Sequence, residues 1–112
     1  MALFHRDIDI TRNVKLIEWL KTEVLTETAT MFKTLSVDAK NDTQDQAAES
    51  LANLVTLSYL LGKRLGVSFQ TIDLKMNDKL QLGVSDKHPL EKDYGDLSEL
   101  LRHLNGTRHI RS

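Results

Sequence analysis

Two pairs of oxygen-bearing side chains have the spacing that places both members on one side of an α-helix. Glu23 and Glu27 are four residues apart in one long segment, and Glu49 and Asn53 are four apart in the next. Residues with this spacing lie one turn apart, about 40° round the helix axis. Two antiparallel helices could therefore direct four oxygen-bearing side chains into one groove, where they would hold a hard divalent cation such as Mg²⁺.

The same spacing has an ordinary structural explanation. Solvated helix surfaces often carry glutamate pairs four residues apart, so the spacing alone is a weak signal. The elements that carry the four residues decide whether they can converge.

The first of these elements is predicted to be a long helix from Thr11 to about Val37. Its apolar residues recur in steps of three and four, which is typical of an amphipathic helix. Asp9 or Thr11 can cap its start. Residues 1–9 before it are predicted to be a flexible leader.

The second element is predicted to be a helix that begins at Asp42 or Thr43 and runs to about Leu65. Residues 38–43 (DAKNDT) separate it from the first helix, and Gly66 is a good C-terminal glycine. Apolar residues lie on several of its sides, and a helix of this kind is normally surrounded by other helices. We therefore expect a homodimer or homotetramer. The largest apolar group is Ala47, Leu51, Leu54, Leu57, Leu61 and Leu65, with Val55 and Tyr59 on a second side and Leu60 on a third.

Shorter helices are predicted in the C-terminal part. One runs from Ser68 to about Leu82 and stops at Gly83, and the other covers residues 97–104. A polar connection, residues 84–94, joins them, and residues 105–112 are predicted to be a flexible tail. The fold class is therefore all-α, with residues 1–112 as a single domain and two long antiparallel helices in an oligomeric four-helix-type bundle.

Composition excludes several classes of function. The 15 basic and 16 acidic residues are balanced, which disfavours a nucleic-acid partner and a helix-turn-helix DNA-binding protein. The chain contains no cysteine and no apolar run long enough to span a bilayer, so we expect a soluble cytoplasmic protein without a membrane partner. A glycine-rich phosphate loop and a hydrolytic triad are not recognisable.

Three sequence motifs occur in a familiar order. Residues 23–27 read EVLTE, residues 49–53 read ESLAN and are followed by an apolar run and Leu65-Gly66, and residues 75–79 read KMNDK. Residues 20–82 thereby resemble the MazG-like branch of the all-α nucleoside triphosphate pyrophosphohydrolases. The corresponding family patterns are Glu-Glu-x-x-Glu, Glu-Glu-Leu-Ala-Asp with a following Leu-Gly, and a third helix whose Lys and Asn approach phosphates.

The resemblance implies a Mg²⁺ site with a degraded motif. The family's four metal-binding positions fall here on Val24, Glu27, Ser50 and Asn53, of which only Glu27 keeps a carboxylate.

Two functions remain open at this point. In the first, the chain is a divergent nucleotide pyrophosphohydrolase. Glu27, Glu49 and Asn53 would hold Mg²⁺, Glu23 and Glu27 would be catalytic, and Lys75 and Lys79 would contact the phosphates of the nucleotide. In the second, the helical bundle is kept without the chemistry, and the chain is a nucleotide-binding or protein-interaction module.

Overall fold

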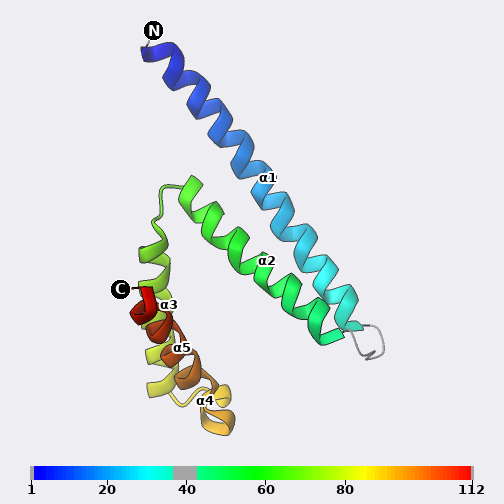
Figure 1. The fold of residues 1–112 in the computed structure, drawn as a ribbon, viewed down its shortest axis with the longest axis vertical. Coiled ribbons are helices and arrows are strands. Elements are labelled where there is room, and N and C mark those ends of the chain that lie inside the picture. The colour runs from blue at the N-terminus through cyan, green and yellow to red at the C-terminus, as the bar shows by residue number, and fades with distance from the viewer. Residues whose placement is uncertain (1, 37–42, 112) are drawn as a thin grey trace. The chain divides into compact units, whose positions relative to one another are not determined.

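The computed structural model describes residues 2–36 and 43–111, with side chains for residues 9–36 and 43–106. Its elements are α1 (Ala2–Ser36), α2 (Thr43–Arg64), α3 (Phe69–Ser85), α4 (Pro89–Tyr94) and α5 (Asp96–Arg111) (Figure 1). Within these ranges every element is a helix, which confirms the all-α class. None of the described helices combines the length and hydropathy needed to cross a bilayer. The chain divides into two compact units between Phe69 and Gln70.

The first unit is a hairpin in which α2 runs back along α1 (Figure 1). Each helix has a row of buried and half-buried residues that faces the other helix. Along each row the residue numbers increase in alternating steps of four and three, which is the repeat of packed antiparallel helices. Leu20, at 4% exposure, is its most buried apolar residue. We call this interface the first seam. It consists of Asn13, Ile17, Leu20, Val24, Glu27, Met31 and Thr34 on α1, and Thr43, Ala47, Ser50, Leu54, Leu57 and Leu61 on α2.

A reciprocal pair of hydrogen bonds sets the register of the hairpin. Asn13 Nδ2 donates to the Arg64 carbonyl oxygen at 3.0 Å, and Arg64 Nη1 donates to Asn13 Oδ1 at 3.2 Å. The first bond satisfies one of the carbonyl groups left without a partner at the end of α2. Counting from this pair in opposite directions along the two helices places Glu27 within about one turn of Ser50.

The end of α2 confirms the glycine predicted to stop it. Gly66 has φ of 88°, its N–H donates to the Lys63 carbonyl at 3.1 Å, and the Val67 N–H donates to the Gly62 carbonyl at 2.8 Å. These two bonds form a Schellman motif, which requires a left-handed residue at the position of Gly66. Beyond Gly66, the ring of Phe69 packs edge-on against the ring of Tyr59, with centroids 5.7 Å apart. Lys63 Nζ lies over the Phe69 ring, 5.8 Å from its centroid.

Replacing Gly66 with alanine should therefore lower the free energy of unfolding by about 1–2 kcal/mol, because a side chain is strained in the left-handed conformation. Urea denaturation followed by circular dichroism measures this. The control is Gly106→Ala in α5, where an added Cβ meets nothing within 4 Å. That change should raise stability by up to about 1 kcal/mol through helix propensity. Equal stability of Gly66→Ala and wild type would contradict the Schellman assignment.

The second unit contains α3, α4 and α5. A Cβ placed on Gly83 of α3 would lie 2.6 Å from Leu97 Cδ1, so the missing side chain of Gly83 gives Leu97 of α5 its space. The α4 helix begins at Pro89, where His88 Nδ1 accepts a hydrogen bond from the Leu90 N–H at 3.1 Å. Pro89 suits the first turn because its fixed φ is helical and its missing N–H has no intrahelical partner there.

Several helix bounds differ from the sequence predictions. The first helix begins at Ala2 rather than at Asp9 or Thr11, since no glycine or proline interrupts it. The third helix continues through Gly83 to Ser85, the segment predicted to be a polar connection contains α4, and the last helix runs to Arg111. The single domain, the flexible leader 1–9 and the flexible tail 105–112 remain predictions.

Glu91 joins α4 to the start of α5. Its carboxylate accepts hydrogen bonds from the Ser98 hydroxyl and, at 2.9 Å, from the Ser98 N–H. The hydroxyl bond foremost, and then the N–H bond, lower the pKa of Glu91 below its ordinary value. Hydrogen bonds to the charged form favour that form.

Glu91 should therefore stabilise the second unit in a pH-dependent way. A carboxyl whose folded pKa is lowered contributes stability above its unfolded pKa, and this contribution is lost as the pH falls through the folded pKa. Wild type should thus be more stable than Glu91→Gln at neutral pH, and the two should converge in acid. Thermal unfolding between pH 2 and 7 measures the difference. The control is Asp93→Asn, which changes an exposed residue of the same helix. If its stability converged with that of wild type in acid to the same extent, the role of Glu91 would be contradicted.

Candidate functional site

Glu27 is the single carboxylate among the residues that form the first seam. It is half-buried on α1, and Ser50, within about one turn of it on α2, is only 5% exposed. The neighbouring seam positions are apolar or small. A carboxylate in such a place gives up part of its hydration, so it is costly unless a bound group or a hydrogen bond compensates it. Glu27 is therefore the first-seam residue that could bind a cation.

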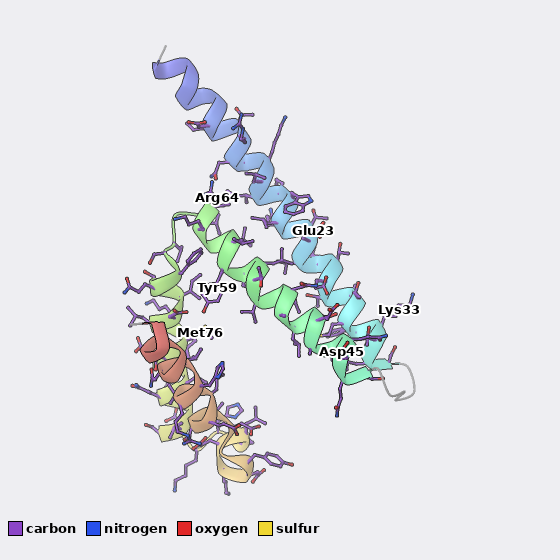
Figure 2. All side chains as sticks on the ribbon, viewed as in Figure 1. Glu23, Lys33, Asp45, Tyr59, Arg64 and Met76 are labelled. Carbon is purple, nitrogen blue, oxygen red and sulfur yellow. The ribbon has the colours of Figure 1, made fainter. Side chains whose placement is uncertain are left out.

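Glu23 and Asn53 lie on one side of the hairpin. Glu23 immediately precedes the seam residue Val24, and Asn53 immediately precedes the seam residue Leu54, at the same place in the four–three repeat. In an antiparallel helix pair, residues at equivalent flanking places lie on the same side of the pair. Glu23 is half-buried, whereas Asn53 is exposed. Figure 2 shows Glu23 on the stretch of α1 that α2 accompanies.

The site residues are thus unequally placed. Glu23, Glu27 and Asn53 border the same side of the first seam, which we call the acidic side. Glu49 is exposed and lies farther round α2 from the seam than Asn53, at the rim of that side. Lys75 and Lys79 are exposed on α3, in the other compact unit.

The spacing of residues within one helix did not identify Ser50 as a site residue. The pairing of Glu49 with Asn53 placed both on one face of α2 but left open which face meets α1. The four–three repeat in α2 contains Ser50 and omits Glu49, and this repeat is the signal that distinguishes them.

The donor set suits a cation that arrives with phosphates. Within residues 9–36 and 43–106, no group of three or more His, Asp or Glu side chains is arranged to hold a metal ion. Mg²⁺, however, is usually bound by one or two carboxylates and completes its octahedron with waters and substrate phosphates. Glu27 and Glu23 supply two carboxylates on one side, and Asn53 a carboxamide oxygen, so these three residues could hold Mg²⁺ only together with ligands from elsewhere.

Comparison with known proteins returned a match to a family profile. The sequence profile of the MazG-like family matches residues 10–97, from the part of α1 near Asn13 to the start of α5. No curated protein and no solved structure matches the chain. Because the matched range covers most of the sequence, the chain belongs to the MazG-like family.

Proposed function

We propose that this MazG-like protein is a divergent nucleotide pyrophosphohydrolase that cleaves the α–β phosphate bond of a nucleotide at the acidic side of the hairpin. The observation that carries the proposal is Glu27, the carboxylate of the first seam, half-buried within about a turn of Ser50. Glu23 on the preceding turn and Asn53 across the pair border the same side.

The proposed roles follow from these positions. Glu27 and Asn53, with Glu49 from the rim, would hold Mg²⁺, which would activate water and neutralise charge on the phosphates. Glu23 and Glu27 are the proposed catalytic residues, and Glu23 would accept the proton of the attacking water. Lys75 and Lys79 are proposed as phosphate contacts on the family resemblance alone, and not on their positions. The oxygen of water joins the α-phosphorus, and pyrophosphate leaves with the electrons of the broken bond. We place this activity in the cytoplasm.

A panel of nucleoside triphosphates with Mg²⁺ or Mn²⁺ tests the proposal. Pyrophosphate and the nucleoside monophosphate should appear in equal amounts, and release should stop when a chelator removes the cation. Because two carboxylates hold a hard cation weakly, the turnover rate should increase as the Mg²⁺ concentration is raised through the millimolar range. Release of inorganic phosphate alone would indicate cleavage at another bond and would contradict the proposal.

The second candidate is a non-catalytic interaction module that assembles as a homodimer or homotetramer. The observation that favours it is the set of large apolar side chains exposed on α2, in which Leu51 is 50%, Val55 54% and Leu60 43% exposed. No release from any nucleotide, together with no binding of Mg²⁺ at millimolar concentration, would select this candidate.

A further inference from the structure

His88 takes part in two helix ends at once, the end of α3 and the start of α4. The His88 N–H donates to the Gly83 carbonyl at 2.9 Å. The Lys87 N–H donates to the Val84 carbonyl at 3.2 Å, and Lys87 has φ of 56°. These two bonds around a left-handed residue form a Schellman motif that ends α3. The side chain of His88 begins directly against α3, because a Cβ placed on Gly83 would lie 3.8 Å from His88 Cβ.

The start of α4 depends on the same histidine. His88 has φ of −49° and ψ of 142°, an extended conformation that suits both an N-cap and a residue before proline. Its carbonyl accepts hydrogen bonds from the Glu91 and Lys92 N–H groups, both at 2.8 Å. Its Nδ1 accepts a hydrogen bond from the Leu90 N–H at 3.1 Å. Nδ1 can accept this bond only while it carries no proton, so the cap requires a neutral imidazole with its hydrogen on Nε2.

Glu91 ties α4 to α5 and has the opposite requirement. Its carboxylate accepts hydrogen bonds from the N–H and the hydroxyl of Ser98, near the start of α5. These bonds favour the ionised carboxylate and lower the pKa of Glu91. Glutamate side chains ordinarily titrate at about pH 4.3 and histidine side chains at about pH 6.5. Between these two pH values, a protonated His88 would no longer cap α4, whereas Glu91 would still hold Ser98.

Three elements meet at the turn between α3 and α4, residues 86–88, which we call the corner. Within residues 9–36 and 43–106, no ion pair joins His88 to any of their charged side chains. Protonation of His88 therefore removes the bond to Leu90 without an ion pair to replace it, and it places a positive charge at the positive end of α4. The charged residues around the corner are Lys79, Asp86 and Lys87 from α3 and the turn, Glu91, Lys92 and Asp93 from α4, and Asp96, Glu99 and Arg102 from α5.

We propose that the corner is a pH-dependent joint, in which protonation of His88 Nδ1 releases the start of α4 while Glu91 keeps α4 tied to α5. A bond that only the unprotonated form makes contributes stability at high pH and loses it as the pH falls through the titration of that group. The joint is therefore closed above the titration range of histidine and open below it. All its contacts lie within the second unit, so it depends neither on hydrolysis nor on self-association.

NMR spectroscopy of the full chain between pH 8 and pH 5 tests the proposal. At pH 8 the imidazole nitrogen shifts should identify Nδ1 of His88 as the nitrogen without a proton. The hydrogen-exchange protection factor of the Leu90 amide, taken relative to the unfolded chain at each pH, should fall about fivefold by pH 5, as expected for the loss of one helix cap. The protection of the Ser98 amide should not change. A proton on Nδ1 at pH 8, constant protection of Leu90, or a parallel loss at Ser98 would each overturn the proposal.

His88→Asn is the matched variant, because asparagine caps a helix through an oxygen that does not titrate. In this variant the Leu90 amide should have the same protection factor at pH 8 and pH 5. The control is His103→Asn, which removes a histidine of α5 and should keep the pH dependence of wild type at Leu90. If His88→Asn kept that pH dependence, another group would control the corner and the proposal would be wrong.

Discussion

Glu27→Gln should lower the rate of pyrophosphate release by about 100-fold or more while the hairpin stays folded. The substitution removes one negative charge and one cation ligand from the first seam and keeps the shape of the side chain. Affinity for a hard cation follows the charge of its ligands, so the Mg²⁺ concentration needed for half-maximal release should also rise.

The stability of Glu27→Gln separates a functional carboxylate from a structural one. A half-buried charge within a helix interface is a cost to folding, and its neutral amide should be equally stable or more stable. Thermal unfolding by circular dichroism should therefore show no loss for Glu27→Gln. Asp45→Asn is the control for activity, since Asp45 is exposed near the start of α2 (Figure 2) and lies outside the first seam. Equal activities of Glu27→Gln and wild type would remove Glu27 from the mechanism.

The sequence predicted the two long helices and the end of α2 because both depend on local rules. Apolar periodicity predicted the helices, and Gly66 sits in the left-handed conformation that a helix stop requires. Gly83 carries the same local signal but lies inside α3. There the glycine makes room for Leu97, a residue of another helix, and this close approach cannot be predicted from the local sequence.

Which of the apolar residues of α2 face α1 was harder to predict. Leu51 and Leu65 were grouped with the more buried apolar residues of the second helix in one broad stripe, yet Leu51 is 50% and Leu65 59% exposed. A stripe that wide contains two adjacent four–three repeats, and hydrophobicity alone does not separate them. The separation comes from which repeat both helices share when they pair, and this is a property of the pair.

The candidate site also depends on which face of α2 meets α1. The spacing of four paired Glu23 with Glu27, and both are half-buried on consecutive turns of α1. The same spacing treated Glu49 and Asn53 as equals, although Asn53 flanks the seam and Glu49 lies farther round α2. Which face of α2 meets α1 depends on contacts between the helices, such as the Asn13–Arg64 pair, and no rule within one helix predicts it.

Asn53→Asp should raise the affinity for Mg²⁺–nucleotide by about 10-fold, and the rate of release with it. The change restores the acid of the family pattern at an exposed position, so folding is little affected. It adds a carboxylate to the acidic side beside those of Glu23, Glu27 and Glu49, and the stability of a bound cation rises with ligand charge. Titration calorimetry with a non-hydrolysable nucleotide analogue and Mg²⁺ measures the affinity.

Gln46→Glu distinguishes direct ligation of the cation from general electrostatic attraction. Gln46 occupies the same place in the repeat two turns before Asn53 and is also exposed. The substitution adds the same charge about 10 Å from Asn53 along α2. At that distance the charge is about one Debye length away at 0.1 M salt, so its effect should be small and should vanish at higher salt. Direct ligation by Asn53→Asp should persist there. Equal gains from the two variants would mean that the acidic side attracts cations without holding them, and the interaction module would then be the better account of the protein.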